Sequence, residues 1–378
     1  MISISGRELD PADEIVQRLV AHSSRWESLN IKLTVVIVTY TIKNIPTVVR
    51  ENIPRLTTLT LTRDEFEFDM DDFSAEHDLV AFVVFEDAPS LHIVEFISWP
   101  KPATLKLPWS QIHHLSAHNM IPNDCIQLMK VAPTLSSCEF TMRMPTVSEM
   151  WEHIATHCVG DYLQSFTLKS GDDFLSLFQL NELLHAVTFP SLEILEIHGN
   201  QAVPTTTIRT DFNGALLAFI RRSSCPLDHL KLHQVPLSKN GLAEVFVPLR
   251  SLRCLEIDAF KVAVAGSPLG IDVLRELAYP DNSNGIRSLP CLSRLSLSCS
   301  LEESEFNKLA DVLESRRAAF DYPHGQVSPL ECVNLHIKAE GEFPYDFNSR
   351  LRILASGGMK IRLNGENLEE TNSEMQRL

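Results

Sequence analysis

The stretch Leu192-Glu193-Ile194-Leu195-Glu196-Ile197 has apolar residues at its first, fourth and sixth positions, and this phrase decides how the chain folds. The spacing of three and then two is neither helical nor strictly alternating. It suits a chain that turns a corner, buries one side chain and enters a short strand whose alternate residues point inward. Eleven copies of the phrase, with apolar equivalents, occur along the chain: Trp26/Leu29/Ile31, Leu56/Leu59/Leu61, Leu91/Val94/Phe96, Ile112/Leu115/Ala117, Leu135/Cys138/Phe140, Leu163/Phe166/Leu168, Leu192/Leu195/Ile197, Leu227/Leu230/Leu232, Leu252/Leu255/Ile257, Leu292/Leu295/Leu297 and Leu330/Val333/Leu335.

Repetition on this scale is typical of a solenoid, in which each repeat buries its apolar face against its neighbours. The sequence therefore predicts an α/β fold: an irregular leucine-rich-repeat-like solenoid, shaped as an arc or horseshoe. Its concave face would be a parallel β-sheet and its convex side would carry the helices. We expect one solenoid of about eleven strand units over residues 1–363, followed by a polar, frayed tail over 364–378.

The segments between the phrases predict helices. Successive phrases are 21 to 40 residues apart, more variable than in a regular leucine-rich repeat. Helical patterns occur in the longer intervals, at Phe174–Leu184, Phe212–Arg222, Gly270–Ala278 and Glu303–Arg317. Several phrases follow a proline that ends a helix and sets an extended entry to the strand: Pro54, Pro89, Pro133, Pro190 and Pro290. Each repeat should thus run helix, corner, strand, although the Val-, Ile- and Thr-rich segment Leu33–Tyr40 favours a strand instead.

Composition excludes several classes of protein. The 378 residues carry a net charge of −16, which argues against a nucleic-acid or anionic-membrane partner. No apolar stretch approaches the roughly 20 residues that span a bilayer, and the N-terminus lacks a secretory signal pattern. The eight cysteines are irregularly spaced, without a Cys-x-x-Cys pair. They indicate buried thiols in a reducing compartment, and we expect an intracellular protein of the cytoplasm, the nucleus or both.

The sequence contains no enzyme signature: it has no Gly-x-Ser-x-Gly elbow, phosphate-binding glycine loop or His-Glu-x-x-His motif. His153 and His157 share a helical spacing and precede Cys158, but no fourth ligand is nearby. The acidic stretch 64–72 lacks the glycine and glutamate of a calcium loop, so it is interpreted as a solvated loop, with docking to a basic partner as the alternative. We expect no catalytic residue, no cofactor and no metal.

The polar residues between the apolar positions predict a recognition surface. If the apolar positions point inward, their neighbours point to the concave face, where varied side chains on a rigid sheet suit protein recognition. The candidate partner-binding residues are His114, His118, Glu139, Lys169, Glu196, His198, His229, Lys231, His233, Glu256, Asp258, Arg294, Asn334 and His336. A repeat surface does not name its partner, so we expect a monomer that binds one or more proteins of unknown identity.

Several longer phrases carry a resemblance to a known family. They are Ala21–Leu29 (AHSSRWESL), Pro54–Leu59, Phe85–Leu91, Leu107–Leu115, Phe189–Glu193, Arg222–Leu227 (RSSCPL) and Leu313–Arg317 (LESRR). In this order they resemble the leucine-rich-repeat-like region of F-box proteins of mushroom-forming (basidiomycete) fungi, over roughly residues 14 to 320. The resemblance implies a region that recognises substrates for a cullin-based ubiquitin ligase without itself catalysing ubiquitin transfer.

In that family an N-terminal F-box docks onto the ligase adaptor. Met1 to Asp13 has no helical F-box pattern, so we expect the F-box to be missing from this chain and the adaptor to bind only if an F-box exists upstream. The alternatives are a structural scaffold, a degenerate paralogue and, less favoured, an α/β enzyme with its site at the strand ends.

Overall fold

The computed structural model divides the chain into two compact units, Met1–Ser165 and Phe166–Leu378. It describes residues 2–4, 18, 20–33, 49, 52–63, 85–99, 101–145, 157–171, 175–199, 211–235, 239–259, 274, 277–278, 289–318, 328–338 and 342–368. Three expectations lie wholly or largely outside these residues: the strand beyond Leu33, the helix over 270–278 and the acidic stretch 64–72.

The first unit contains a parallel sheet with helical segments between its strands. The strands, in spatial order, are β1 (Ile2–Ile4), β2 (Ser28–Leu33), β3 (Thr58–Arg63), β4 (Ile93–Ile97), β5 (His114–Met120) and β6 (Ser137–Met142). A two-residue strand, β7 (Cys158–Val159), follows them. The helical segments are η1 (Ser23–Arg25), η4 (Pro102–Thr104), η5 (Trp109–Gln111) and α4 (Pro122–Val131).

The short helical segments correct the expectation of one helix per repeat. Between β4 and β5 the described residues form only the 3₁₀ turns η4 and η5. The phrases that frame this interval, at Leu91 and Ile112, are 21 residues apart. The segment 98–113 is as long as the segment 121–136, which holds α4, but it contains Pro100, Pro102 and Pro108, and proline interrupts an α-helix. Leucine-rich repeats of this length commonly use a 3₁₀ turn there.

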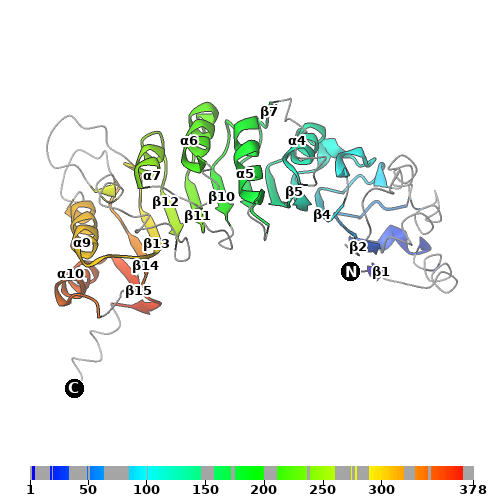
Figure 1. The fold of residues 1–378 in the computed structure, drawn as a ribbon. Coiled ribbons are helices and arrows are strands. Elements are labelled where there is room, and N and C mark those ends of the chain that lie inside the picture. The colour runs from blue at the N-terminus through cyan, green and yellow to red at the C-terminus, as the bar shows by residue number, and fades with distance from the viewer. Residues whose placement is uncertain are drawn as a thin grey trace, which may run out of the picture. The chain divides into compact units, whose positions relative to one another are not determined.

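The second unit has a longer parallel sheet with α-helices on one side (Figure 1). Its strands, in spatial order, are β8 (Ser165–Lys169, whose first residue belongs to the first unit), β10 (Ile194–His198), β11 (His229–His233), β12 (Cys254–Asp258), β13 (Arg294–Ser300), β14 (Cys332–Lys338), β15 (Lys360–Leu363) and the antiparallel β16 (Glu366–Asn367). The remaining elements are α5 (Leu175–Ala186), β9 (Val187–Thr188), α6 (Phe212–Ser223), α7 (Lys239–Phe246), α9 (Glu303–Ala318) and α10 (Tyr345–Ser356). Neighbouring helices pack side by side: α5 on α6, α6 on α7 and α9 on α10.

The core confirms the α/β repeat pattern that the sequence predicts. Each of the eleven phrases leads into one parallel strand, and every apolar position of the phrases is buried. Within a strand the burial alternates, as in β11, where Leu230 and Leu232 are buried between half-buried polar residues. Burying a leucine side chain stabilises the fold by about 1.5–3 kcal/mol. Burial of the apolar phrase residues is therefore the main contribution to the free energy that holds each repeat to the next.

Arginine and serine side chains near the helix ends connect consecutive repeats. Arg222, in the last turn of α6, donates from Nη2 to the carbonyl oxygens of Leu184 (2.5 Å) and Val187 (2.7 Å), at the end of α5. The buried hydroxyl of Ser223 accepts a hydrogen bond from the Phe189 amide at 3.1 Å. Carbonyl groups at the end of a helix lack intrahelical partners, so these bonds satisfy them and fix the spacing of the repeats.

The C-terminal end is more ordered than the sequence suggests. Residues 364–368, assigned above to the polar tail, form a turn and β16, and Leu368 is buried. Residues 369–378 lie outside the described part of the chain. All eight cysteines are free thiols, as expected, and four of them are buried. In the described part, no helix has both the length and the apolar character needed to cross a membrane.

Candidate functional site: the open face of the sheet

All fourteen candidate residues lie on strands, at the alternate positions that are not buried. In the first unit these are His114 and His118 on β5 and Glu139 on β6. In the second unit they are Lys169 on β8, Glu196 and His198 on β10, His229, Lys231 and His233 on β11, Glu256 and Asp258 on β12, Arg294 on β13, and Asn334 and His336 on β14. The opposite side of each strand packs into the core, so these residues define an open face in each unit.

On the second unit, strand register arranges the open face in three rows. The first row is Ile194, His229, Cys254, Arg294, Cys332 and Lys360. The second row is Glu196, Lys231, Glu256, Ser296, Asn334 and Arg362. The third row is His198, His233, Asp258, Ser298 and His336. Parallel strands lie about 4.8 Å apart, so neighbours within a row are in contact range.

Over β10–β12, carboxylates lie beside one lysine and several histidines. Lys231 Nζ lies 3.9 Å from an oxygen of Glu196 and 3.9 Å from an oxygen of Glu256. His198 Nε2 lies 3.3 Å from Glu196, and His233 Nε2 lies 2.7 Å from Asp258. Partly exposed pairs of this kind contribute about 0–1 kcal/mol each, so they orient side chains more than they stabilise the fold.

The imidazole of His198 is the most perturbed histidine of the face. Burial lowers its pKa, the hydrogen bond that the ring donates to the Glu196 carboxylate opposes that effect, and the charge of Lys231 lowers the pKa further. Its ring also packs at a tilt against that of His233, with centroids 5.4 Å apart and an interplanar angle of 39°. The ring is therefore held largely neutral near pH 7.

Over β13–β15 the open face is basic. The outward positions of these three strands carry five basic side chains and no carboxylate: Arg294, His336, Lys338, Lys360 and Arg362. All five are exposed, and Arg362 donates from Nε to Asn367 Oδ1 at 3.0 Å. This group, the basic patch, stands out in a chain of net charge −16.

Sequence reasoning missed three members of the basic patch. Lys360 and Arg362 lie on β15, which lacks the first position of the repeat phrase and shows only the alternation of Met359, Ile361 and Leu363. Lys338 lies three positions beyond Leu335, the last apolar residue of the phrase on β14. Searching the sequence for apolar residues at alternate positions over only four residues would have found β15. A pattern this short also predicts many strands that do not form.

The open face of the first unit is mainly neutral and polar. His118 is the centre of its network: Nε2 lies 3.6 Å from Glu95 and 3.1 Å from Ser116 Oγ, and Nδ1 lies 2.9 Å from Thr141 Oγ1. Glu95 also accepts a hydrogen bond from Thr60 at 3.0 Å. The sequence did not single out Glu95, although it lies at the outward position between Val94 and Phe96.

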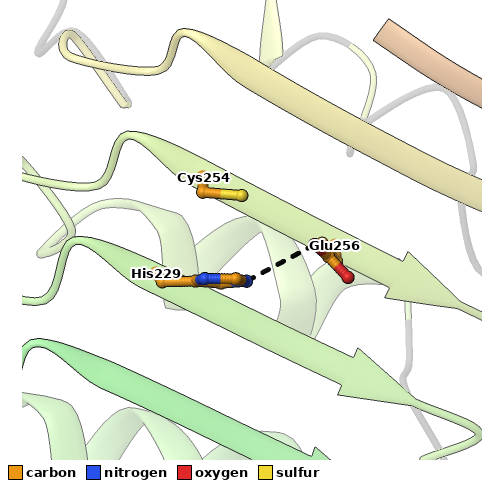
Figure 2. A group of neighbouring side chains, drawn as sticks. All are labelled: His229, Cys254 and Glu256. Atoms are coloured by element: carbon orange, nitrogen blue, oxygen red, sulfur yellow. Dashed lines mark ion pairs between the residues drawn. The ribbon is translucent and has the colours of Figure 1, made fainter. Parts of the chain in front are cut away.

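Two groups bear on metal binding. His157 is exposed and Cys158 is buried, while His153 lies outside the described residues. By contrast, His229 on β11 and Cys254 and Glu256 on β12 stand together on the open face of the second unit, as Figure 2 shows. Their donor atoms all lie within 4.8 Å of one another. The sequence did not predict this group, because only the register between β11 and β12 brings His229 next to Cys254 and Glu256.

Comparisons with known proteins leave the family open. No family model matches the chain, and no curated protein matches it. Among solved structures, 24 chains match, including one described as "Crystal structure of Rad7 and Elc1 complex in yeast". That chain is 13% identical, with a TM-score of 0.35, and the match covers 96% of this chain and 79% of the other. A similarity this weak assigns neither a family nor a function.

Proposed function

We propose that the protein is a non-enzymatic interaction module that binds a protein partner on the open face of its second unit. The observation that carries the proposal is the set of three registered rows, which hold chemically varied side chains on a rigid, helix-free face. Repeat proteins use such sheet faces for recognition because the backbone is already ordered before binding.

The charges on the face favour one kind of partner. Over β10–β12 the open face carries the carboxylates of Glu196, Glu256 and Asp258 against the single ammonium group of Lys231, so these strands do not attract an acidic ligand. The basic patch on β13–β15 has no carboxylate beside it on these strands, and its Arg side chains suit bidentate contacts with carboxylates. A protein segment rich in Asp and Glu is therefore the partner that the face fits best.

More specifically, we propose that the protein is the substrate-recognition region of a receptor for a cullin-based ubiquitin ligase. The repeat phrases that resemble fungal F-box proteins support this proposal. Recruitment to the ligase would require an F-box encoded upstream of Met1. The test is co-purification of the protein, expressed from its complete gene, with the ligase adaptor. Absence of the adaptor from a complex that still contains the partner would overturn the ligase role alone.

Paired charge reversals test the interaction itself. The variant Arg294→Glu/Arg362→Glu changes the basic patch, and Lys308→Glu/Arg352→Glu makes the same charge change on exposed positions of α9 and α10. Affinity purification with quantitative mass spectrometry would identify the partner, and calorimetry with both purified proteins would give its Kd. We expect the patch variant to weaken binding at least tenfold, about 1.4 kcal/mol, and the helix variant to leave it unchanged. Equal binding by both variants would overturn the proposal.

A further inference from the structure

Strand register brings three metal-ligating residue types to one point of the open face. His229 and Cys254 are direct register partners on β11 and β12, and Glu256 follows Cys254 by two positions on the same face. Figure 2 shows the three side chains on one side of the sheet, with the ring of His229 extending toward Glu256. An imidazole, a thiol and a carboxylate are therefore held by two directly paired strands.

The distances fit a tetrahedral ion. His229 Nε2 lies 3.5 Å from Glu256 Oε1, and no pair of donor atoms is more than 4.8 Å apart. Around a tetrahedral zinc ion, with bonds of about 2.0–2.3 Å to nitrogen, oxygen and sulfur, donor atoms lie about 3.3–3.6 Å from one another. The imidazole–carboxylate distance already matches, and the Cys254 sulfur lies within 4.8 Å of both other donor atoms.

The group also has an unmet polar requirement. The Nε2 atom of His229 is buried and makes no hydrogen bond, although it faces the Glu256 carboxylate. A buried ring nitrogen that makes only this long contact and no hydrogen bond costs free energy. A dication coordinated by all three groups would satisfy the nitrogen and stabilise the thiolate beside the carboxylate.

We propose that His229, Cys254 and Glu256 bind a zinc ion. Imidazole and thiolate ligands favour zinc over magnesium or calcium, which take oxygen ligands. Three protein ligands leave the fourth position for water. The second oxygen of Glu256 lies 3.9 Å from Lys231 Nζ, so Lys231 orients the carboxylate and leaves Oε1 facing His229. The site does not depend on the proposed interaction function.

Cobalt substitution tests the site on the full-length protein after metal removal with a chelator. Cobalt reports thiolate ligation through a sulfur-to-metal charge-transfer band, and zinc competition then gives the zinc Kd. We expect one equivalent of cobalt with this band, displaced by zinc with a Kd of about 1 μM or tighter.

Five single variants locate the ligands. Cys254→Ser should abolish the charge-transfer band, and His229→Gln and Glu256→Gln should each weaken zinc binding at least tenfold. Cys332→Ser, from the same row two strands away, and His233→Gln, from the same strand, should leave both measurements unchanged. Circular dichroism checks that each variant is folded.

Three results would overturn the proposal: no stoichiometric cobalt binding by the folded wild-type protein, a band that persists in Cys254→Ser, or equal losses in Cys332→Ser. Partner binding is then measured with and without chelator. This measurement tests the interaction proposal separately from the zinc proposal, so the failure of one can be told from the failure of the other.

Discussion

Arg316 is the clearest case of a single side chain that connects two repeats. Only 1% of its surface is exposed, although it carries a charged group. Its guanidinium donates from Nε to the Leu277 carbonyl at 2.7 Å and from Nη1 to the Leu289 carbonyl at 2.8 Å. Burial lowers its pKa to about 10, which still leaves the group protonated at neutral pH.

Replacing Arg316 with Met should lower the free energy of unfolding by about 2–4 kcal/mol, because two buried carbonyl groups lose their donor. Urea denaturation followed by circular dichroism measures the change. The matched control is Arg352→Met on the exposed surface of α10, expected within about 0.5 kcal/mol of wild type. Similar losses in both variants would show that the carbonyl contacts contribute little.

The histidine at the edge of the charged network should make stability depend on pH. The pKa of His198 is lowered in the folded protein from 6.5, so the unfolded chain binds this proton more readily. The stability that follows from this difference is complete above about pH 6.5 and falls as the pH drops toward the folded pKa. Asn at position 198 removes the proton-binding group.

We therefore expect His198→Asn to lose less stability than wild type between about pH 7.5 and about pH 5.5. The measurement is the free energy of unfolding in urea at both pH values. His336→Asn, at an exposed position of the same row on β14, should follow the wild-type dependence. Parallel curves for wild type and His198→Asn would contradict this prediction.

At the scale of elements, the sequence predicted what depends on local periodicity. The spacing of apolar residues within each strand phrase predicts which of its side chains are buried. The same kind of local spacing predicted the helices Phe212–Ser223 and Glu303–Ala318. The sequence could not predict contacts between distant positions: Arg222 and Leu184 are 38 residues apart.

The candidate face was predictable in outline for the same reason. Alternation within a strand places residues such as Lys231 and Glu256 on the open side. Which of them touch depends on the register between strands, which the sequence of one strand does not contain. The grouping of His229 with Cys254 and Glu256 therefore needed the structure.

Gly199 fixes the end of β10 against its neighbour. Its amide donates to the His233 carbonyl at 2.7 Å. A Cβ atom at this position would lie 2.2 Å from the backbone oxygen of Gln234, whose own φ is +55°. Because the obstacle is backbone rather than a flexible side chain, the two strand ends would have to separate.

Gly199→Ala should therefore lower the free energy of unfolding by about 1–3 kcal/mol, as overpacking does elsewhere. Urea denaturation is again the measurement. The control is Gly357→Ala, where the nearest atom would lie 3.3 Å from the new Cβ and the expected loss is smaller. Loss of stability in the control alone would contradict the close approach seen at Gly199.

For the molecule as a whole, the core is a series of neighbouring contacts rather than one central cluster. Each inner strand of the second unit, such as β12, pairs only with the strands on either side of it. In such an array, stability is a sum of repeat terms and nearest-neighbour terms. A local defect should therefore open the neighbouring repeats before it affects distant ones.

Leu255→Ala removes a fully buried side chain from β12 and should cost about 2–5 kcal/mol. Hydrogen exchange with mass spectrometry should show lost amide protection in β11–β13, while β2–β5 keep theirs. Leu59→Ala, at the equivalent fully buried position of β3, should give the reverse distribution. A uniform loss of protection along the chain would instead indicate a single cooperative unit.

The short hairpin of β15 and β16 has a consequence for solubility. A parallel sheet ends in a row of unpaired backbone groups, which can recruit the edge of another molecule and begin aggregation. Here the last parallel strand is covered by an antiparallel strand of only two residues, with the exposed charges of Lys360, Arg362 and Glu366 around it. The hairpin thus leaves incoming chains too little edge to extend the sheet, and it protects a repeat architecture that could otherwise keep growing.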